Sequence, residues 1–308
     1  MTRKRIIKTA VLAFWLALMA WWWQESRTWP VPEKIEAAFL PDFNDYFSIE
    51  YDGRRIGWAY KGLRRLPDGA YTGSQGITVA VQIDGISVDV RLDALVNFDR
   101  ALNISDFQYL LEAGPFQMTE KGLVKDGQLA VSVNLGEHGP ILESFLAEYG
   151  HFLGSYTEQL DFSREVLNPV PTGPVLGAFI GPFISYAGLE PGRNYSLDIL
   201  DPVSRQPRPL TVRVVEKTRE MDVESGQTVD VYQLLVGVSG QESRLWVNKF
   251  GRTFRESGLG FTLTKTEDKT QATNEIEPFQ PPRSLRLFLT EGPAREFLQH
   301  SVNKENKP

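Results

Sequence analysis

Cysteine is absent from this 308-residue sequence, and its absence excludes several kinds of chemistry. Without a thiol the chain has no disulfide framework, no thiolate nucleophile, no thiolate zinc site and no cysteine for a bacterial lipid anchor. It also lacks the G-x-S-x-G motif of a catalytic serine, the phosphate-binding G-x-x-x-x-G-K-[ST] motif and a G-x-G-x-x-G that opens a helix. The histidines His138, His151 and His300 are too far apart for the spacing of a zinc site. We therefore expect no catalytic residue, no metal ion and no cofactor.

Outside the first 30 residues the chain is acidic overall. These residues hold five basic side chains against one acidic side chain, a net charge of +4, whereas the whole chain carries −6, so the remainder carries −10. Binding to nucleic acid through phosphate neutralisation needs clustered lysine and arginine. The acidic body of the chain therefore argues against a nucleic-acid partner.

Long apolar runs are also rare, and the clearest one follows the basic stretch MTRKRIIK at the N-terminus. From Ile6 to Trp23 there are 18 residues with Lys8 as the only charge, which is near the lower limit for crossing a bilayer. Lys8 can extend to one interface, and tryptophans suit the opposite interface. The aromatic residues of this predicted anchor are Trp15, Trp21, Trp22 and Trp23. The basic end predicts a cytoplasmic N-terminus, and so a single-pass protein of the inner membrane with a periplasmic body. A cleaved signal peptide and a soluble buried helix are the alternatives.

The feature that the sequence repeats most is the β-hairpin. The stretch FSIEYDGRRIGWAYKG (47–62) is typical of two strands joined by an Asp-Gly turn, and AVQIDGISVDV (80–90) and LVKDGQLAVSV (123–133) repeat this pattern. Asp-Gly between alternating apolar and polar residues is a strong hairpin signal, because such a turn needs positive φ. The alternation gives the predicted sheet one apolar face, which another element must cover. Further strands are expected at 194–202, 208–217, 228–238, 243–251 and 260–266.

Between the two groups of strands the sequence pattern changes. Apolar residues recur every three or four positions in GPILESFLAEYGHFL (139–153), which predicts a helix. The uncharged stretch that follows, GPVLGAFIGPFISYAGL (173–189), is interrupted by Pro182 and has small residues spaced four apart. We interpret it as a buried, kinked helical segment that covers the sheet. A mobile apolar lid, a membrane-facing patch and a second membrane span are the alternatives.

Together these patterns predict a mainly β protein with a helical insert. The expected architecture is a curved antiparallel sheet, a half-open barrel or a sandwich built from hairpins, with one N-terminal transmembrane helix. The expected organisation is a basic cytoplasmic end and membrane anchor at 1–30 with the span at about 6–23, a linker at 31–45, an antiparallel β part at 46–136, a helical insert at 137–192, a second β part packing with the first at 193–268, and a polar tail at 269–308.

Acidic and aromatic residues are the remaining candidates for a site. Glu220, Asp222 and Glu224 alternate and could gather a calcium ion, although this spacing is more typical of a solvated face. Paired carboxylates for glycosidic acid–base chemistry would meet only in space. The aromatic residues of the first hairpin and the last strands are expected in the core, and a cavity for an apolar ligand is their functional alternative.

Three stretches resemble a known module. YFSIEYDGRRIGWAYKGLRRLPDGAYTGSQGITVAVQIDG resembles the start of a β-rich extracytoplasmic module of Gram-negative envelope proteins, which often precedes a transglutaminase-like domain. GLEPGRNYSLDILDPVSRQPRPLTVRVVEK is similar to its G-L-x-P-G-x-x-Y run, D-P turn and valine-rich strand, and ESRLWVNKFGRTFRESGLGFTL is similar to its closing hairpin. The resemblance spans roughly residues 45–266 and implies an antiparallel half-barrel that binds lipophilic cargo or a protein partner. No catalytic residue is carried over, because this chain stops where the catalytic domain would begin and has no cysteine for that chemistry.

The leading functional hypothesis is a non-enzymatic, membrane-anchored periplasmic binding or accessory module for a lipophilic ligand. We expect any cavity to lie beneath 173–189 and to be lined by Trp58, Val81, Val90 and Phe179. The alternative is a structural or accessory subunit of a larger inner-membrane assembly, held through the aromatic transmembrane helix. A third hypothesis, from another class, is a hydrolase that uses two carboxylates.

Overall fold

The computed structural model of the chain describes residues 28–30, 40–83, 86–100, 102–113, 116–125, 128–134, 166–169, 179–200, 207–238, 241–258 and 260–279. Its first strands are β1 (Thr28–Pro30), β2 (Phe43–Tyr51), β3 (Arg54–Arg65), β4 (Tyr71–Ile83), β5 (Ile86–Phe98), β6 (Ile104–Ala113), β7 (Phe116–Lys125), β8 (Gln128–Asn134) and β9 (Val166–Pro169). They are followed by α3 (Ile180–Ala187), β10 (Asn194–Leu200), β11 (Pro207–Met221), β12 (Thr228–Val238), β13 (Gln241–Asn248), β14 (Thr253–Gly258), β15 (Phe261–Thr266) and α4 (Lys269–Thr273).

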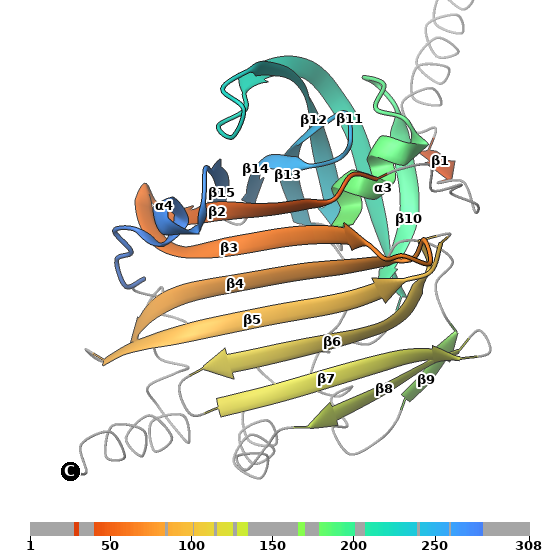
Figure 1. Cartoon of the computed structure of the whole chain (residues 1–308), viewed down its shortest axis with the longest axis horizontal. Helices are drawn as coiled ribbons and strands as arrows, with labels where there is room; N and C mark the ends of the chain where they lie inside the picture. The colour runs from red at the N-terminus through yellow and green to blue at the C-terminus, as the bar shows by residue number, and fades with distance from the viewer. Residues whose placement is uncertain are drawn as a thin grey trace, which may run out of the picture.

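The strands form one continuous sheet in the order β1-β10-β11-β12-β13-β14-β15-β2-β3-β4-β5-β6-β7-β8-β9 (Figure 1). Neighbouring strands of the described part are antiparallel, except that β1 runs parallel to β10. The strands from the two halves of the chain join where β15 pairs with β2, from Phe261 opposite Tyr51 to Thr266 opposite Tyr46. The predicted mainly β, antiparallel fold is therefore confirmed.

The first predicted hairpin has the turn that its sequence requires. Asp52 and Gly53 have φ angles of 50° and 72°, and they join β2 to β3. Positive φ at both central residues is the requirement of a two-residue type I′ turn. The registers of β4 with β5 and of β7 with β8 also leave two-residue connections. All three predicted hairpins are thus present.

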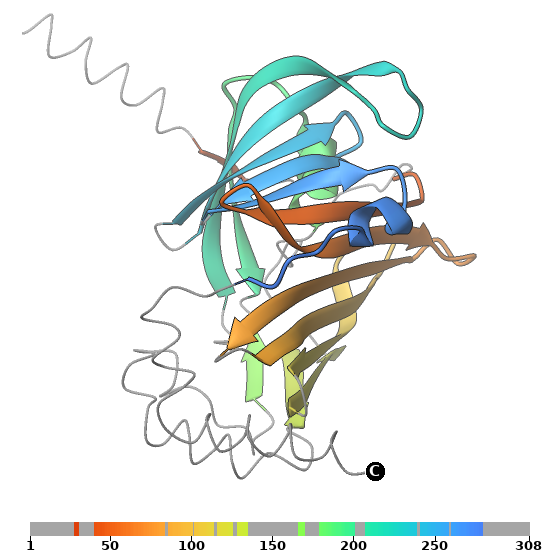
Figure 2. The same ribbon diagram turned by 90° about the vertical axis from the view of Figure 1, so that its left-hand side faces the viewer.

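The apolar face of the sheet is covered by α3 and the residue before it. Phe179 and Phe183 pack into a cluster contributed mainly by β3–β8. Ile180 and Ile184 pack into a second cluster, from β10–β13. Because one short segment contacts both halves, the sheet bends around it, and Figure 2 shows this strong bend. We call this apolar side the inner face and the opposite side the outer face.

Two glycines let α3 dock closely on the turn between β13 and β14. A Cβ atom at Gly181 would lie 2.2 Å from the carbonyl oxygen of Gly251, and a Cβ atom at Gly251 would lie 2.2 Å from the backbone of Gly181. The segment Ile180–Ile184 is buried. The interpretation of 173–189 as a buried covering segment is thus confirmed for residues 179–184, whereas residues 185–189 are half-buried.

The predicted polar tail begins too early. Residues 269–273 form α4, and the chain then continues along the sheet, where the N–H of Glu277 donates to the carbonyl of Arg55. Phe279 bridges to β4, donating to the carbonyl of Ala80 and accepting from the N–H of Gln82. The pairing of β3 with β4 stops at Gly57 opposite Val79, so the next residues of β4 can pair with Phe279 instead. The boundary at 269 is therefore wrong by at least 11 residues.

Two other predicted boundaries also shift. The linker at 31–45 ends earlier, because β2 begins at Phe43. The helical insert at 137–192 contains the strand β9, which pairs with β8. The helix expected at 139–153 and the membrane anchor at 6–23, with Trp15, Trp21, Trp22 and Trp23, lie outside the described residues. Within the described ranges, no helix combines the length and apolarity that a membrane span requires.

Candidate functional site

The structure does not bring the four predicted cavity residues together. Val81 and Val90 lie on the inner face, as does Phe179, whose ring packs over Gly73 of β4. Val81 is eight residues from Gly73 along β4, a distance on the order of 26 Å at the rise of a strand. Trp58 pairs with Thr78, whose side chain projects from β4 to the face opposite that of Val81. Trp58 therefore faces outward. The predicted lining of a single cavity is therefore wrong.

The outer face carries a groove instead. It has a volume of about 710 Å³ and is open to solvent along β2–β5, with α4 at one end. We call it the aromatic groove. It is lined by Asp42, Phe43, Asn44, Tyr46, Trp58, Tyr60, Gly62, Leu63, Arg64, Thr72, Ser74, Arg91, Leu95 and Lys269.

Aromatic rings form one side of this groove because of the period of two along β3. Trp58 and Tyr60 are two residues apart, so both project outward, with ring centroids 6.1 Å apart and ring planes inclined by 30°. Tyr46 of β2 is the direct partner of Tyr60. A Cβ atom at Gly76 would lie 2.1 Å from Cε1 of Tyr60, so the glycine makes room for the ring to lie across β4. The result is a cluster of three aromatic side chains on the outer face.

A hydrogen bond and an ion pair fix the edge of this aromatic cluster. The hydroxyl of Tyr60 donates to Oδ1 of Asp93 at 3.0 Å, and Nε of Arg91 lies 2.6 Å from Oδ2 of the same carboxylate. Burial and the neighbouring Asp93 carboxylate raise the pKa of Tyr60 to about 12. Tyr60 therefore stays protonated near neutral pH and keeps its ring in one orientation.

A chain of hydrogen-bonded polar side chains begins at Thr72 in the groove and continues away from it to Asn97 and Asp106. The hydroxyl of Thr72 donates to Oδ1 of Asn97 at 2.9 Å, and Nδ2 of Asn97 donates to Oδ1 of Asp106 at 2.7 Å. These contacts hold the side chains of β4, β5 and β6 in register. Thr72 is thus the member of this chain that the groove presents.

The helix α4 closes one end of the aromatic groove. Nζ of Lys269 lies 5.0 Å from the ring centroid of Trp58, a cation–π contact. Nη1 of Arg55 donates to the carbonyls of Gln271 and Asn274, at 3.0 Å each, and so holds the helix on the sheet. The end wall of the groove therefore carries a positive charge.

A second hollow of about 410 Å³ lies farther across the outer face, on β5–β8. Leu95 lines both hollows, so the two adjoin. Leu95 and Leu123 are unusually exposed for leucine, at 46% and 56%. The second hollow is lined by Leu95, Asp106, Phe107, Gln108, Lys121, Gly122, Leu123, Ala130 and Ser132.

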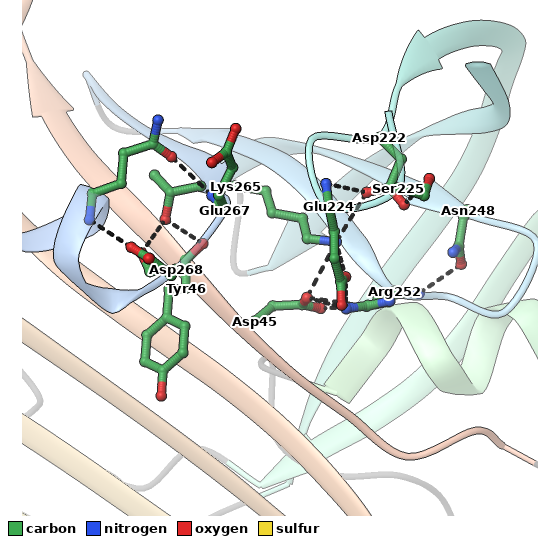
Figure 3. Close-up of polar contacts among 12 residues, drawn as sticks. Asp45, Tyr46, Asp222, Glu224, Ser225, Asn248, Arg252, Lys265, Glu267 and Asp268 are labelled. Atoms are coloured by element: carbon green, nitrogen blue, oxygen red, sulfur yellow. Dashed lines mark hydrogen bonds and ion pairs between the residues drawn. The ribbon is translucent and has the colours of Figure 1, made fainter. Parts of the chain in front are cut away.

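A buried ionic network is the other polar feature of the molecule (Figure 3). Nε of Arg252 lies 2.8 Å from Oδ2 of Asp45, and Nζ of Lys265 lies 3.2 Å from Oδ1 of Asp45. Lys265 also contacts Asp222 at 3.2 Å and Glu224 at 3.3 Å, so the network ties the β11–β12 turn to β2 and β15. The side chains of Asp45 and Lys265 are only 1% and 4% exposed. Each of these buried charges has lost its hydration and therefore depends on its oppositely charged partners for stabilisation.

The network shifts the pKa values of its outer members. Burial alone would raise the pKa of Asp222, but the Ser225 hydroxyl and the Lys265 ammonium hold it below its ordinary value. Burial would likewise raise the pKa of Glu224, but Arg252 and Lys265 hold it low. Both carboxylates are thus held in their charged form.

The network corrects the interpretation of the acidic run as a solvated face. Glu220 accepts from Nη2 of Arg255 at 3.3 Å, and the side chains of Glu220 and Asp222 are only 30% and 14% exposed. The correction does not extend to Glu224, which is 54% exposed. In the part of the chain that the structure describes, no group of three or more histidine or acidic side chains is arranged to hold a metal ion. The signal that sequence reasoning missed was Arg252 and Lys265, which pair with the run only in the folded sheet.

Comparisons with known proteins add little to this picture. No protein-family model matches the sequence, and no curated protein matches it. One similar crystal structure is a β-barrel-like protein of a domain of unknown function, DUF1849, from Brucella abortus, with 11% identity over 73% of this chain and 95% of that chain and a TM-score of 0.48. Another is a DUF1089 family protein from Pseudomonas aeruginosa, with 13% identity, 65% and 90% coverage and a TM-score of 0.35. Likenesses this weak do not say what the chain binds.

Proposed function

We propose that this chain is a non-enzymatic binding module that takes a glycan in the aromatic groove of its outer face. The observation that carries this proposal is the pair of rings of Trp58 and Tyr60, which lie side by side on one strand. Aromatic rings present a negative π face that attracts polarised C–H groups, and a sugar ring offers a row of these. The flat faces of the two rings therefore suit successive sugar rings.

The rest of the groove suits hydroxyl-rich ligands. Asn44, Thr72 and Ser74 line it with neutral groups that both donate and accept hydrogen bonds. Small apolar ligands prefer enclosed pockets with few polar groups, which this open groove is not. Nucleic acids bind through clustered lysine and arginine, whereas this chain carries a net charge of −6. A glycan therefore suits the groove better than an apolar ligand or a nucleic acid does.

This proposal changes where the ligand lies but keeps the class of function expected from sequence. A lipophilic ligand beneath 173–189 loses its support, because Phe179 and Ile184 fill that space against the sheet. Attachment to the inner membrane through residues 6–23 and a periplasmic location remain part of the proposal and rest on the sequence alone. The assembly-subunit alternative also remains a prediction, because its four tryptophans lie outside the described residues.

Titration calorimetry of the full chain tests the proposal. The probes are chitohexaose, cellohexaose and a hyaluronan hexasaccharide, with a single-stranded oligothymidine and phosphatidylglycerol vesicles representing other ligand classes. We expect binding of at least one oligosaccharide and a loss of about tenfold or more in affinity for Trp58→Ala, as for other aromatic anchors. Trp58→Phe keeps a ring and should retain part of the affinity.

Trp246→Ala is the matched control. Trp246 also faces outward, on β13, where it stacks with the guanidinium of Arg255 at 4.1 Å, but it does not line the groove. Its loss should leave oligosaccharide affinity unchanged. Binding of only the oligothymidine or only the vesicles would overturn the proposal, as would equal effects of Trp58→Ala and Trp246→Ala.

A further inference from the structure

One transverse row of residues lines both hollows of the outer face. The residues of this row are paired from strand to strand, and we call them the floor row. Its members are Asn44 of β2, Gly62 of β3, Ser74 of β4, Leu95 of β5, Gln108 of β6, Lys121 of β7 and Ser132 of β8. The first four line the aromatic groove and the last four line the second hollow, with Leu95 common to both. The two hollows therefore form one path across the strands.

The path is long. Seven strands give six spacings of about 4.8 Å, or about 29 Å in all. Gly62, Ser74 and Ser132 are small and leave room above the sheet, whereas Leu95 stands between the two hollows. The neighbouring row on one side contains Tyr46 and Tyr60, which pair with each other. The neighbouring row on the other side contains Leu123. This shape suits an extended chain that lies across the strands rather than a single sugar.

The charges along the path favour a negatively charged chain. Its carboxylates are already held: Asp42 accepts from the N–H of Arg65 at 2.8 Å, and Asp106 accepts from Asn97. Asp93 is held in the same way, by Tyr60 and Arg91. By contrast, Arg64, Lys121 and Lys269 are exposed, and none of them forms an ion pair with another described residue. Arg64 and Lys269 lie near the part of the path on β3, and Lys121 lies near its end on β7 and β8.

We infer that the ligand is an acidic glycan long enough to fill both hollows, with Trp58 and Tyr60 holding one part and Lys121 the other. This inference rests on the proposed function and adds to it the length and the charge of the ligand. A carboxylate, phosphate or sulfate group on the glycan would meet the ammonium group of Lys121 in a charge-assisted contact. Stacking would then act on the part of the path at β3, and charge would act there and at the end on β7 and β8.

A length ladder of hyaluronan fragments, from tetrasaccharide to decasaccharide, tests this inference on the full chain. We expect affinity to rise with length and then level off. Lys121→Gln should weaken binding of the decasaccharide by about fivefold and leave the tetrasaccharide unchanged. Trp58→Ala should weaken binding of both. Lys249→Gln removes an exposed lysine of the β13–β14 turn, outside both hollows, and controls for the change in net charge.

The outcomes separate the two proposals. If Lys121→Gln weakens long and short fragments equally, or neither, while Trp58→Ala still weakens both, the second hollow is not a subsite and the inference fails alone. Equal affinity for neutral chitin oligomers of the same lengths would overturn the assignment of an acidic ligand. If Trp58→Ala has no effect at any length, the proposed function fails as well. Lys121 is exposed, so its variant is expected to fold normally.

Discussion

Gly251→Ala should destabilise the protein by about 2–5 kcal/mol. Gly251 has a φ of +76°, and an L residue in the left-handed region costs about 1–2 kcal/mol. The added methyl carbon would also lie 2.2 Å from the backbone of Gly181 and 2.3 Å from the nitrogen of Pro182. These are backbone atoms at the start of α3, so the helix itself must move, and overpacking of this kind adds about 1–3 kcal/mol.

Gly53→Ala isolates the second contribution. Gly53 has nearly the same φ, +72°, but no atom lies within 4 Å of the position its Cβ would take. Its substitution should cost only the backbone contribution, about 1–2 kcal/mol. Urea unfolding of both variants measures the difference as a change in midpoint at constant slope. Equal costs for Gly251→Ala and Gly53→Ala would refute the docking of α3 on the β13–β14 turn, and with it the account of how the inner face is covered.

Three other perturbations test the ionic network and the C-terminal segment. Asp45→Asn should lower the free energy of unfolding in urea by about 3 kcal/mol. This is the low end for a broken buried ion pair, because Lys265 keeps its other carboxylate partners. Asp230→Asn breaks an exposed ion pair, and an equal or larger cost for that variant would contradict burial of the network. The pKa values of Asp222 and Glu224 are lowered on folding, so the stability that their charged forms contribute is complete above pH 4.5 and is lost as the pH falls below 3.8. The melting temperature should therefore drop in acid. This drop should be smaller when both residues are changed to amides. Phe279→Ala should cost about 2 kcal/mol, less than a fully buried phenylalanine, and a loss within error would mean that this segment is not attached to the sheet.

Local patterns were enough to predict the hairpins and the β class. Asp52 and Gly53 adopt the positive φ that their residue types favour, and strict alternation puts Val81 and Val90 on the apolar face, as it should. The covering role of the 173–189 segment followed from its apolarity and from the need to cover one face of the sheet. These inferences depend on neighbours in sequence, which a single sequence displays.

The site depended on pairings that a sequence does not display. The prediction for Trp58 is wrong because β3 does not alternate cleanly between apolar and polar residues. A bulge at Ile49 and Glu50 also shifts the register between β2 and β3. The floor row exists only through the register of seven strands. Lys269 reaches Trp58 only because α4 folds back onto β3, which the polar composition after residue 266 gave no reason to expect.

The most direct test of the central claim is to locate the bound glycan. A hyaluronan decasaccharide that carries a photoreactive diazirine at its reducing end would be bound to the full chain, irradiated and mapped by peptide mass spectrometry. The account predicts adducts on the outer face, within 42–64 or 121–132, that disappear with excess unlabelled ligand. Competed adducts confined to 179–189, or no competed adducts on a protein that binds the glycan in solution, would contradict it.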